Sequence, residues 1–227
     1  VKEADIVIFA GGISPSLEGE EMYSVNSPGF AGGDRTSIEL PQVQRDILKA
    51  LKKAGKKVVF VNCSGSAVAL VPEMESCDAI LQAWYPGQSG GLAVADVLFG
   101  DFNPSGKLPV TFYRNTDQLP DFEDYSMKNR TYRYMTEAPL FPFGYGLSYT
   151  TFDISKGRLN KKTISAGQGL NFKVNVKNTG KYDGAEVIQV YVRKVDDAEG
   201  PIKSLRAFRR VPLKAGETCV VSIDLLP

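Results

Sequence analysis

Three largely apolar runs near the start of the chain each end in a loop of small residues. The runs are Ile6–Phe9, Val58–Val61 and Ala79–Tyr85, and the loops that follow them begin at Ala10, Asn62 and Pro86. Apolar runs of this length are typical of strands in a parallel sheet with both faces covered. We therefore expect three buried parallel strands whose small-residue loops lie along one edge of the sheet, where α/β proteins bind ligands.

The stretches between these runs are expected to form helices. Residues 41–54 carry apolar side chains at helical spacing, with Pro41 suited to the first turn and Gly55 lying just past the last. Shorter helices are expected at residues 67–74 and 92–99. This alternation predicts an α/β fold with an open, mostly parallel sheet flanked by helices.

The pattern changes in the second half of the chain. Residues 115–138 are polar without a clear period, and beyond Phe152 apolar and polar residues alternate in the manner of strands, at 170–176, 187–192 and 220–225. This spacing predicts an antiparallel β-sandwich of the immunoglobulin or fibronectin III kind. We expect an α/β domain at 1–114, a linker and junction segment at 115–152, and the sandwich at 153–227. Both domains are expected to be truncated, at Val1 and at Pro227.

Composition excludes several classes of function. The 27 basic and 26 acidic side chains nearly cancel, so no net field favours nucleic acid, and no apolar run is long enough to span a membrane. Histidine is absent, which excludes Ser-His-Asp and Cys-His catalysis from these residues alone. Cys63, Cys77 and Cys219 lack the spacing of metal ligands and are expected to be buried free thiols. We expect no metal and no cofactor.

An acidic loop follows the first apolar run. Glu18, Glu20 and Glu21 lie within four residues of one another, in a loop expected at the ligand-binding edge of the sheet. A glutamate there can donate a proton if its surroundings raise its pKa, and the alternative is a solvated acidic loop. The nearby Ser64–Ser66 segment has no histidine partner and is expected to cap a helix.

Several long motifs occur along the chain, at residues 85–88, 100–112, 141–152, 178–180, 184–191, 205–211 and 216–217. Together they resemble glycoside hydrolase family 3, the β-glucosidase and β-xylosidase group. The chain resembles the C-terminal half of that family over essentially its whole length and in the same order. The resemblance implies an α/β sandwich domain followed by a fibronectin type III-like domain.

The resemblance also implies a mechanism. Retaining enzymes of this kind use one carboxylate as nucleophile and a second carboxyl as acid and then base, about 5 Å apart. In the family the nucleophile is an aspartate on an N-terminal (β/α)8 barrel, which this chain lacks. The acid/base is a glutamate of an α/β-domain loop, and Glu20 aligns best with it, with Glu18 and Glu21 as alternatives. If they are not the donor, Glu18 and Glu21 are expected to be surface charges, and Asp34 and Arg35 to form an ion pair that shapes the loop.

Four further side chains are candidates for binding the substrate. Trp84 and Tyr85 have aromatic faces suited to stacking on a sugar ring, although Trp84 is equally suited to a core. Arg130 and Tyr132 lie in the polar segment and are expected at an aglycone site, and residues 131–134 resemble the β-xylosidase branch of the family.

These observations predict part of an exo-acting retaining β-glycosidase that releases terminal β-D-glucosyl or β-D-xylosyl residues from oligosaccharides or other β-glycosides. Its partner is the barrel domain of the same parent protein, and the resemblance implies secretion or periplasmic residence. The chain alone is expected to be inactive. The alternative is a noncatalytic carbohydrate-binding or structural module.

Overall fold

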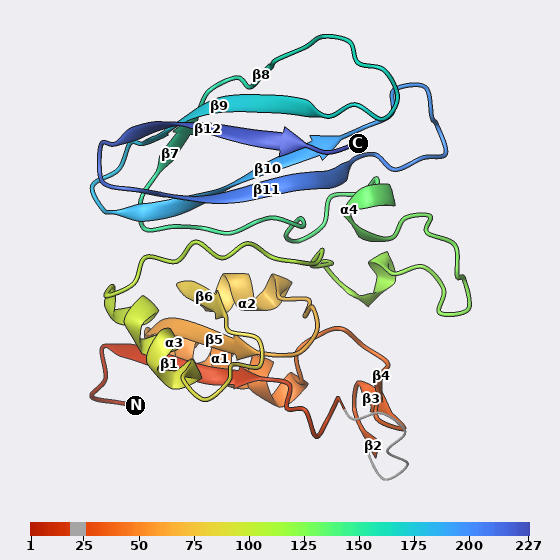
Figure 1. Cartoon of the computed structure of the whole chain (residues 1–227). Coiled ribbons are helices and arrows are strands. Elements are labelled where there is room, and N and C mark those ends of the chain that lie inside the picture. The colour runs from red at the N-terminus through yellow and green to blue at the C-terminus, as the bar shows by residue number, and fades with distance from the viewer. Residues whose placement is uncertain (19–25) are drawn as a thin grey trace. The chain divides into compact units, whose positions relative to one another are not determined.

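The computed structural model describes residues 1–18 and 26–227, and every structural statement below refers to these residues (Figure 1). The chain forms two compact units. The first, here the α/β unit, comprises Val1–Val94, Val110–Arg130 and Thr136–Pro142. The second, the sandwich unit, comprises Ala95–Pro109, Thr131–Met135 and Phe143–Pro227. Because the units are defined by proximity rather than by order along the chain, the domain boundaries expected at 114 and 152 stay a prediction.

The α/β unit is built on three parallel strands in the order β1-β5-β6. They are β1 (Ile6–Gly12), β5 (Lys57–Cys63) and β6 (Ala79–Gln82), so each predicted strand is present. The predicted helices are present as α1 (Gln42–Lys53), α2 (Val71–Ser76) and α3 (Gly90–Phe99). The predicted α/β architecture is therefore confirmed.

The expectation that all three strands are buried on both faces is wrong for β1 and for β6, in which Ala79 is exposed and the other residues are half-buried. Ile6 and Ile8 are 56% and 51% exposed, whereas Val58 and Phe60 of the central strand β5 are fully buried. β1 lies at the edge of the sheet, and its Phe9 packs against the core that includes Phe60 and Leu48 of α1. Successive side chains of a strand point to opposite faces, so Ile6 and Ile8 lie on the face that the described residues leave open.

Two element boundaries differ from the sequence-based expectation for clear reasons. Residues 67–70 are not helical, because Ala69 pairs with Glu39 in a parallel bridge before α2 begins. The expected third strand ends at Gln82 rather than Tyr85, because Trp84 has a φ of 57° and cannot continue a strand.

The thiols of the chain are all free, as expected, but only one of them is buried. Cys77 lies in the core of the α/β unit, where burial raises its pKa to about 11, while Cys63 and Cys219 are half-buried. A thiol with so high a pKa is a packing residue rather than a nucleophile.

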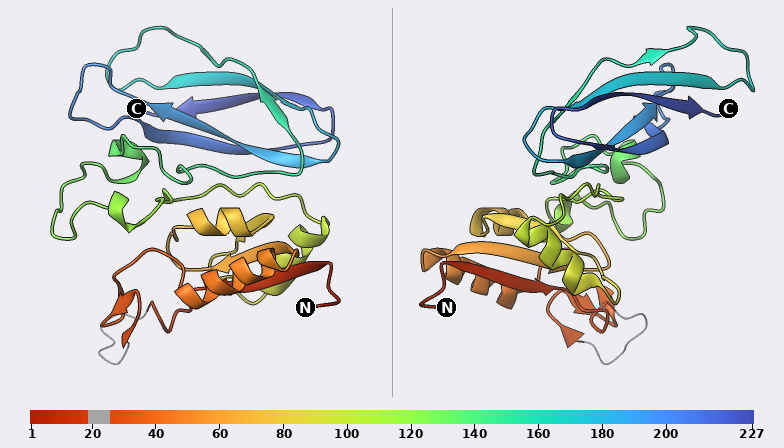
Figure 2. Two further views of the ribbon diagram at one scale, coloured as in Figure 1. Left: turned by 180° about the vertical axis from the view of Figure 1, so that it is seen from behind. Right: turned by 60° about the vertical axis from the view of Figure 1, so that its left-hand side comes forward.

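The sandwich unit consists of antiparallel strands in two sheets that lie face to face (Figure 2). One sheet pairs β10 with β11, and the other has the order β12-β9-β7, with β8 also paired to β9. Alternate residues of β9 to β12 point inward and form a single apolar core, which confirms the predicted sandwich. The strands are β7 (Phe152–Ile154), β8 (Arg158–Leu159), β9 (Leu170–Asn178), β10 (Gly184–Val192), β11 (Ser204–Leu213) and β12 (Thr218–Leu225).

One buried amide closes the end of the sandwich. Asn178 is fully buried, and its Oδ1 accepts hydrogen bonds from Thr150 Oγ1 at 2.7 Å and from the Gly180 N–H at 3.1 Å. Its Nδ2 donates to the carbonyls of Tyr182 and Leu213, at 2.8 and 3.2 Å. Both acceptor positions and both donor positions of the amide are therefore used.

The remaining elements are short. A small antiparallel sheet contains β2 (Asn26–Ser27), β3 (Phe30–Ala31) and β4 (Asp34–Arg35). The polar segment, expected to be irregular, holds a 3₁₀ turn, η1 (Thr116–Gln118), and one helical turn, α4 (Thr131–Tyr134). No helix in the described part of the chain is long and apolar enough to cross a membrane.

Glu39 fixes η1 to the chain that precedes α1. Its carboxylate accepts hydrogen bonds from the Thr116 N–H at 3.0 Å, from Thr116 Oγ1 at 2.6 Å and from Ser37 Oγ. Burial pushes the pKa of Glu39 up, but these hydrogen bonds outweigh it and hold the pKa at about 2, against an ordinary value of 4.5. The folded chain therefore resists protonation of Glu39 more strongly than the unfolded chain does.

We expect this carboxylate to make the α/β unit sensitive to acid. Because the folded pKa is depressed, the stability that Glu39 contributes is complete above about pH 4.5 and is lost as the pH falls towards about 2. Glu39→Gln is expected to lower stability at neutral pH and to flatten its decline over that acid range. Urea unfolding followed by the fluorescence of Trp84, the single tryptophan, measures both effects. Glu123→Gln, at an exposed position, is the matched control, and an equal acid slope in both variants would contradict the assignment.

Candidate active site

The carboxyl ends of the three parallel strands bring their loops together. Ile13 follows β1, the Ser64–Ser66 turn follows β5, and Tyr85 lies just beyond β6. The Ile13 N–H donates to the Cys63 carbonyl at 2.8 Å, and Tyr85 Oη donates to the Ile13 carbonyl at 2.8 Å. The loops thus meet at the predicted edge of the sheet.

Gly12 makes the turn out of β1 possible. Its φ is 122°, and a Cβ atom at this position would lie 1.9 Å from the Cys63 carbonyl oxygen, so a side chain is excluded. Gln44 of α1 bonds both polar backbone groups of Gly12. Its Oε1 accepts from the Gly12 N–H at 2.8 Å, and its Nε2 donates to the Gly12 carbonyl at 2.7 Å.

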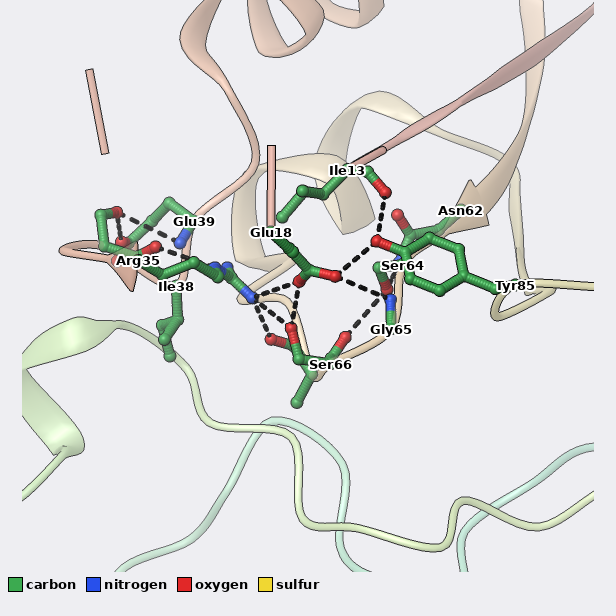
Figure 3. Close-up of polar contacts among 12 residues, drawn as sticks. Ile13, Glu18, Arg35, Ile38, Glu39, Asn62, Ser64, Gly65, Ser66 and Tyr85 are labelled. Atoms are coloured by element: carbon green, nitrogen blue, oxygen red, sulfur yellow. Dashed lines mark hydrogen bonds and ion pairs between the residues drawn. The ribbon is translucent and has the colours of Figure 1, made fainter. Parts of the chain in front are cut away.

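Glu18 is the described glutamate of the acidic loop, and Glu20 and Glu21 lie outside the described residues. Its Oε1 accepts from Ser66 Oγ and lies 3.7 Å from Arg35 Nη1. Its Oε2 accepts from the Gly65 N–H at 3.2 Å and contacts Tyr85 Oη (Figure 3). The side chain is only 14% exposed. The expectation that Glu18 is a plain surface charge is therefore wrong, because the loops after β5 and β6 and the strand β4 all contact its carboxylate.

Arg35 connects β4 to this carboxylate. Its Nη1 donates to Ser66 Oγ at 2.8 Å and to the Ala67 carbonyl at 3.0 Å, and its Nε donates to the Ser37 carbonyl at 3.2 Å. Burial lowers the pKa of Arg35, and the charges of Glu18 and Glu39 oppose that shift. Nη2 is buried and has no partner among residues 1–18 and 26–227.

The predicted ion pair between Asp34 and Arg35 is wrong. Arg35 is paired with Glu18 instead, and Asp34 is exposed. Both residues belong to β4, where neighbouring side chains point to opposite faces, so the two charges diverge.

Polar side chains beneath the site hold the Ser64–Ser66 turn. Buried Asn62 donates from Nδ2 to Gln82 Oε1 at 2.6 Å, and Gln82 Nε2 donates to Ser64 Oγ at 3.1 Å. Ser64 Oγ donates in turn to the Ser66 carbonyl at 2.8 Å. The expected helix cap at this turn is wrong, since α2 has no side-chain cap and begins only after Leu70. Sequence reasoning did not find Ser66, Asn62 or Gln82 as site residues. Asn62 and Ser66 lie in the loop expected after the second predicted strand, which could have signalled them, whereas Gln82 lies inside the third predicted strand.

Two of the four candidate sugar-binding residues lie at or beside this site. Tyr85 contacts Glu18, and burial and the hydrogen bond to Glu18 raise its pKa to about 12. Trp84 is half-buried, with its ring edge-on to Phe112 at 6.0 Å between centroids. Trp84 therefore packs against its own unit, as the core alternative anticipated, and a sugar contact for either residue stays a prediction.

Arg130 and Tyr132 make other contacts. Arg130 donates to the carbonyls of Asp121, Asp124 and Ser126 in its own loop, at 3.0, 2.5 and 3.1 Å. Tyr132 belongs to the sandwich unit, where its ring stacks on Phe143 at 4.3 Å and its Oη accepts from the Leu205 N–H at 3.1 Å. Their proposed role in binding substrate stays a prediction.

The backbone at Gly65 lies close to the side chains of Tyr85 and Glu18. A Cβ atom there would lie 2.5 Å from a ring carbon of Tyr85 and 3.0 Å from Glu18 Oε2. We expect Gly65→Ala to displace Tyr85 and lower the free energy of unfolding by about 1–3 kcal/mol, the usual cost of overpacking. Gly87→Ala, where a Cβ atom would meet nothing within 4 Å, is the matched control and should change stability by less than about 0.5 kcal/mol. Urea unfolding followed by Trp84 fluorescence separates the two, and equal stabilities would contradict the close contact.

A comparison with protein-family models decides the family. Residues 1–149 match the model of the glycosyl hydrolase family 3 C-terminal domain. The chain belongs to glycosyl hydrolase family 3. A fibronectin type III-like domain model matches residues 186–227 of this family 3 chain, in agreement with the sandwich unit.

Relatives of this family 3 chain include enzymes with curated names. It is 63% identical to a xylan 1,4-β-xylosidase of Xylanibacter ruminicola, over 99% of this chain and 26% of the relative. It is 42% identical to a periplasmic β-glucosidase of Salmonella typhimurium, over 99% of this chain and 30% of the relative. The family 3 chain thus spans about a quarter to a third of the length of these relatives.

Solved structures of family 3 β-glucosidases have the same fold. One from Erythrobacter marinus matches with a TM-score of 0.86 and 38% identity, over 100% of this chain and 30% of that chain. One from Listeria innocua, in complex with isofagomine, matches with a TM-score of 0.81 and 33% identity, over 99% of this chain and 32% of that chain.

Proposed function

We propose that this family 3 chain supplies the acid/base loop of an exo-acting retaining β-glycosidase. The observation that carries the proposal is the placement of the acidic loop. It leaves β1 at the ligand-binding edge of a family 3 C-terminal domain, and the loops after β5 and β6 hold Glu18 there. Relatives named as a β-xylosidase and a β-glucosidase support this class of activity.

The proposed division of labour assigns the nucleophile to the rest of the protein. The relatives are three to four times longer than the matched region, which leaves room for a (β/α)8 barrel that carries an aspartate nucleophile. The α/β unit then contributes the carboxyl that protonates the departing glycosidic oxygen and later accepts a proton from water.

Glu20 remains our first candidate for this carboxyl, with Glu18 and Glu21 as alternatives. Both carboxylate oxygens of Glu18 already contact neighbouring side chains or backbone, whereas a proton donor must face the glycosidic oxygen of the substrate. Glu18 would have to give up contacts with Tyr85 or Ser66 to act as the donor.

The proposed substrates are oligosaccharides or other β-glycosides with a terminal β-D-glucosyl or β-D-xylosyl residue. The relative at 63% identity is named for xylan, which favours the xyloside. Trp84, Tyr85, Arg130 and Tyr132 are the proposed substrate contacts. One relative is named periplasmic, which supports the proposal that the protein is secreted or periplasmic.

Assays of the full-length protein test the function. Aryl β-xylosides and aryl β-glucosides should be hydrolysed with net retention, seen by NMR as the β-anomer of the released sugar. The 227-residue chain alone should show no turnover, because the nucleophile lies elsewhere. Inactivity of the full-length protein, together with oligosaccharide binding seen as a change in Trp84 fluorescence, would favour the noncatalytic carbohydrate-binding module instead.

A further inference from the structure

The hydroxyl of Tyr85 has two acceptors and only one proton. Tyr85 Oη lies 2.8 Å from the Ile13 carbonyl oxygen and also contacts Glu18 Oε2. A carbonyl accepts but never donates, so the contact with Ile13 requires the proton of Tyr85. While Tyr85 donates its proton to Ile13, its contact with Glu18 can be a hydrogen bond only if Glu18 carries a proton and donates it to Tyr85 Oη.

The other contacts of Glu18 do not present this choice. Ser66 Oγ accepts from Arg35 Nη1 at 2.8 Å and is free to donate its own proton to Glu18 Oε1. The Gly65 N–H donates to Glu18 Oε2 at 3.2 Å. Ser66 and Gly65 each have a proton available for Glu18. Among these three donors, Tyr85 is therefore the one whose single proton must serve two acceptors.

We propose that Tyr85 is a positioning residue whose hydroxyl turns between the Ile13 carbonyl and the Glu18 carboxylate, holding Glu18 in place whether or not it carries a proton. When Glu18 is ionised, the Tyr85 O–H donates to Oε2. When Glu18 is neutral, its O–H donates to Tyr85 Oη, and the Tyr85 O–H turns to the Ile13 carbonyl. One hydrogen bond between the two side chains is kept in both states, and no heavy atom has to move.

The charges around this pair act in both directions. Arg35, from β4, is a positive charge 3.7 Å from Glu18 Oε1, and Glu39 is a negative charge close to Arg35. The β5 loop contributes the uncharged Ser66 and Gly65. The pair is thus placed where a proton can be taken up and released without loss of the loop geometry.

This inference deepens the proposed function, since an acid/base loop has to keep its shape while protons move through it. Its test uses no substrate, so a negative result would leave the glycosidase proposal standing, and an inactive parent protein would leave this inference standing.

The test is an NMR titration of the whole chain labelled with carbon-13 at Cζ of tyrosine. On acidification from about pH 8, the Tyr85 signal should show a step as Glu18 takes up its proton and the hydroxyl turns. The Tyr85 hydroxyl does not ionise in that range, because its pKa is about 12. Glu18→Gln should remove the step. Tyr149, whose hydroxyl donates to the Val97 carbonyl at 2.7 Å, is the internal control in the same sample.

A second variant gives an independent measurement. Tyr85→Phe removes the hydrogen bond between the two side chains in both states, so the carboxyl signal of Glu18, followed with carbon-13 glutamate, should differ from that of the wild type at both ends of the titration. A flat Tyr85 signal in the wild type, a step that persists in Glu18→Gln, or a Glu18 carboxyl signal that is the same in Tyr85→Phe as in the wild type would each overturn the proposal.

Discussion

Replacing Glu20 with alanine in the full-length protein is expected to lower turnover of aryl β-glycosides with poor leaving groups by roughly 10²–10⁴-fold. A poor leaving group needs a proton as the glycosidic bond breaks, so removal of the acid slows that step most. Glycosides with good leaving groups need little protonation and should still form the glycosyl-enzyme intermediate. Comparison of kcat/KM across aryl glycosides of decreasing leaving-group pKa measures the effect.

Azide completes the assignment. Breakdown of the intermediate requires a base to activate water, but azide is a nucleophile that needs no base. Azide should therefore restore turnover of activated substrates in Glu20→Ala and give the β-glycosyl azide as product. Glu18→Ala and Glu21→Ala are the matched variants. If one of them shows the rescue and Glu20→Ala does not, the acid/base role moves to that residue.

Replacing Arg45 with alanine is expected to lower the free energy of unfolding of the α/β unit by about 3–5 kcal/mol. Glu73 of α2 is 1% exposed, and its Oε1 lies 3.1 Å from Arg45 Nε of α1. Its Oε2 has no partner among the residues that the structure describes. Without Arg45, a buried carboxylate would be left without its counter-charge. This loss destabilises the folded chain far more than the loss of an exposed ion pair does.

Two comparisons isolate the buried charge as the cause. Lys52→Ala breaks the pair of Lys52 with Asp78, whose side chains are 45% and 43% exposed, and should change stability little. Glu73→Gln, added to Arg45→Ala, should recover part of the loss, because it removes the uncompensated charge. Urea unfolding followed by Trp84 fluorescence reports on this unit alone, since Trp84 is the single tryptophan. Equal losses for Arg45→Ala and Lys52→Ala would contradict the argument.

Local patterns were sufficient to predict most of the architecture. The apolar runs predicted β1, β5 and β6, and alternation predicted β9, β10 and β12, because burial on one or both faces leaves a direct mark on the sequence. β11 was not expected as a strand from its residues, since three arginines and Pro212 obscure its alternation. The open face of β1 could not be predicted either, because it depends on which elements cover the strand.

The site was less predictable, because its contacts join distant residues. Tyr85 and Glu18 are 67 residues apart, and Ser66 and Glu18 are 48 apart. The edge of the sheet on which these loops meet followed from the order of strands and helices. The identity of the side chains that contact Glu18 could not be predicted in this way, because it depends on the conformation of the loops. The mistaken pairing of Asp34 with Arg35 has the same origin: adjacency in sequence was taken for proximity, but a strand separates neighbouring side chains.

The end of the sandwich unit depends on the chemical integrity of the Asn178 amide. Hydrolysis of its side-chain amide, with loss of ammonia, would leave an aspartate of almost the same shape. The oxygen replacing Nδ2 would then face the carbonyls of Tyr182 and Leu213, and two attractive contacts would become repulsive. Ageing at this one position would open the end of the sandwich without any change in the rest of the chain. Burial, which slows the entry of water, is thus what preserves the amide on which that end depends.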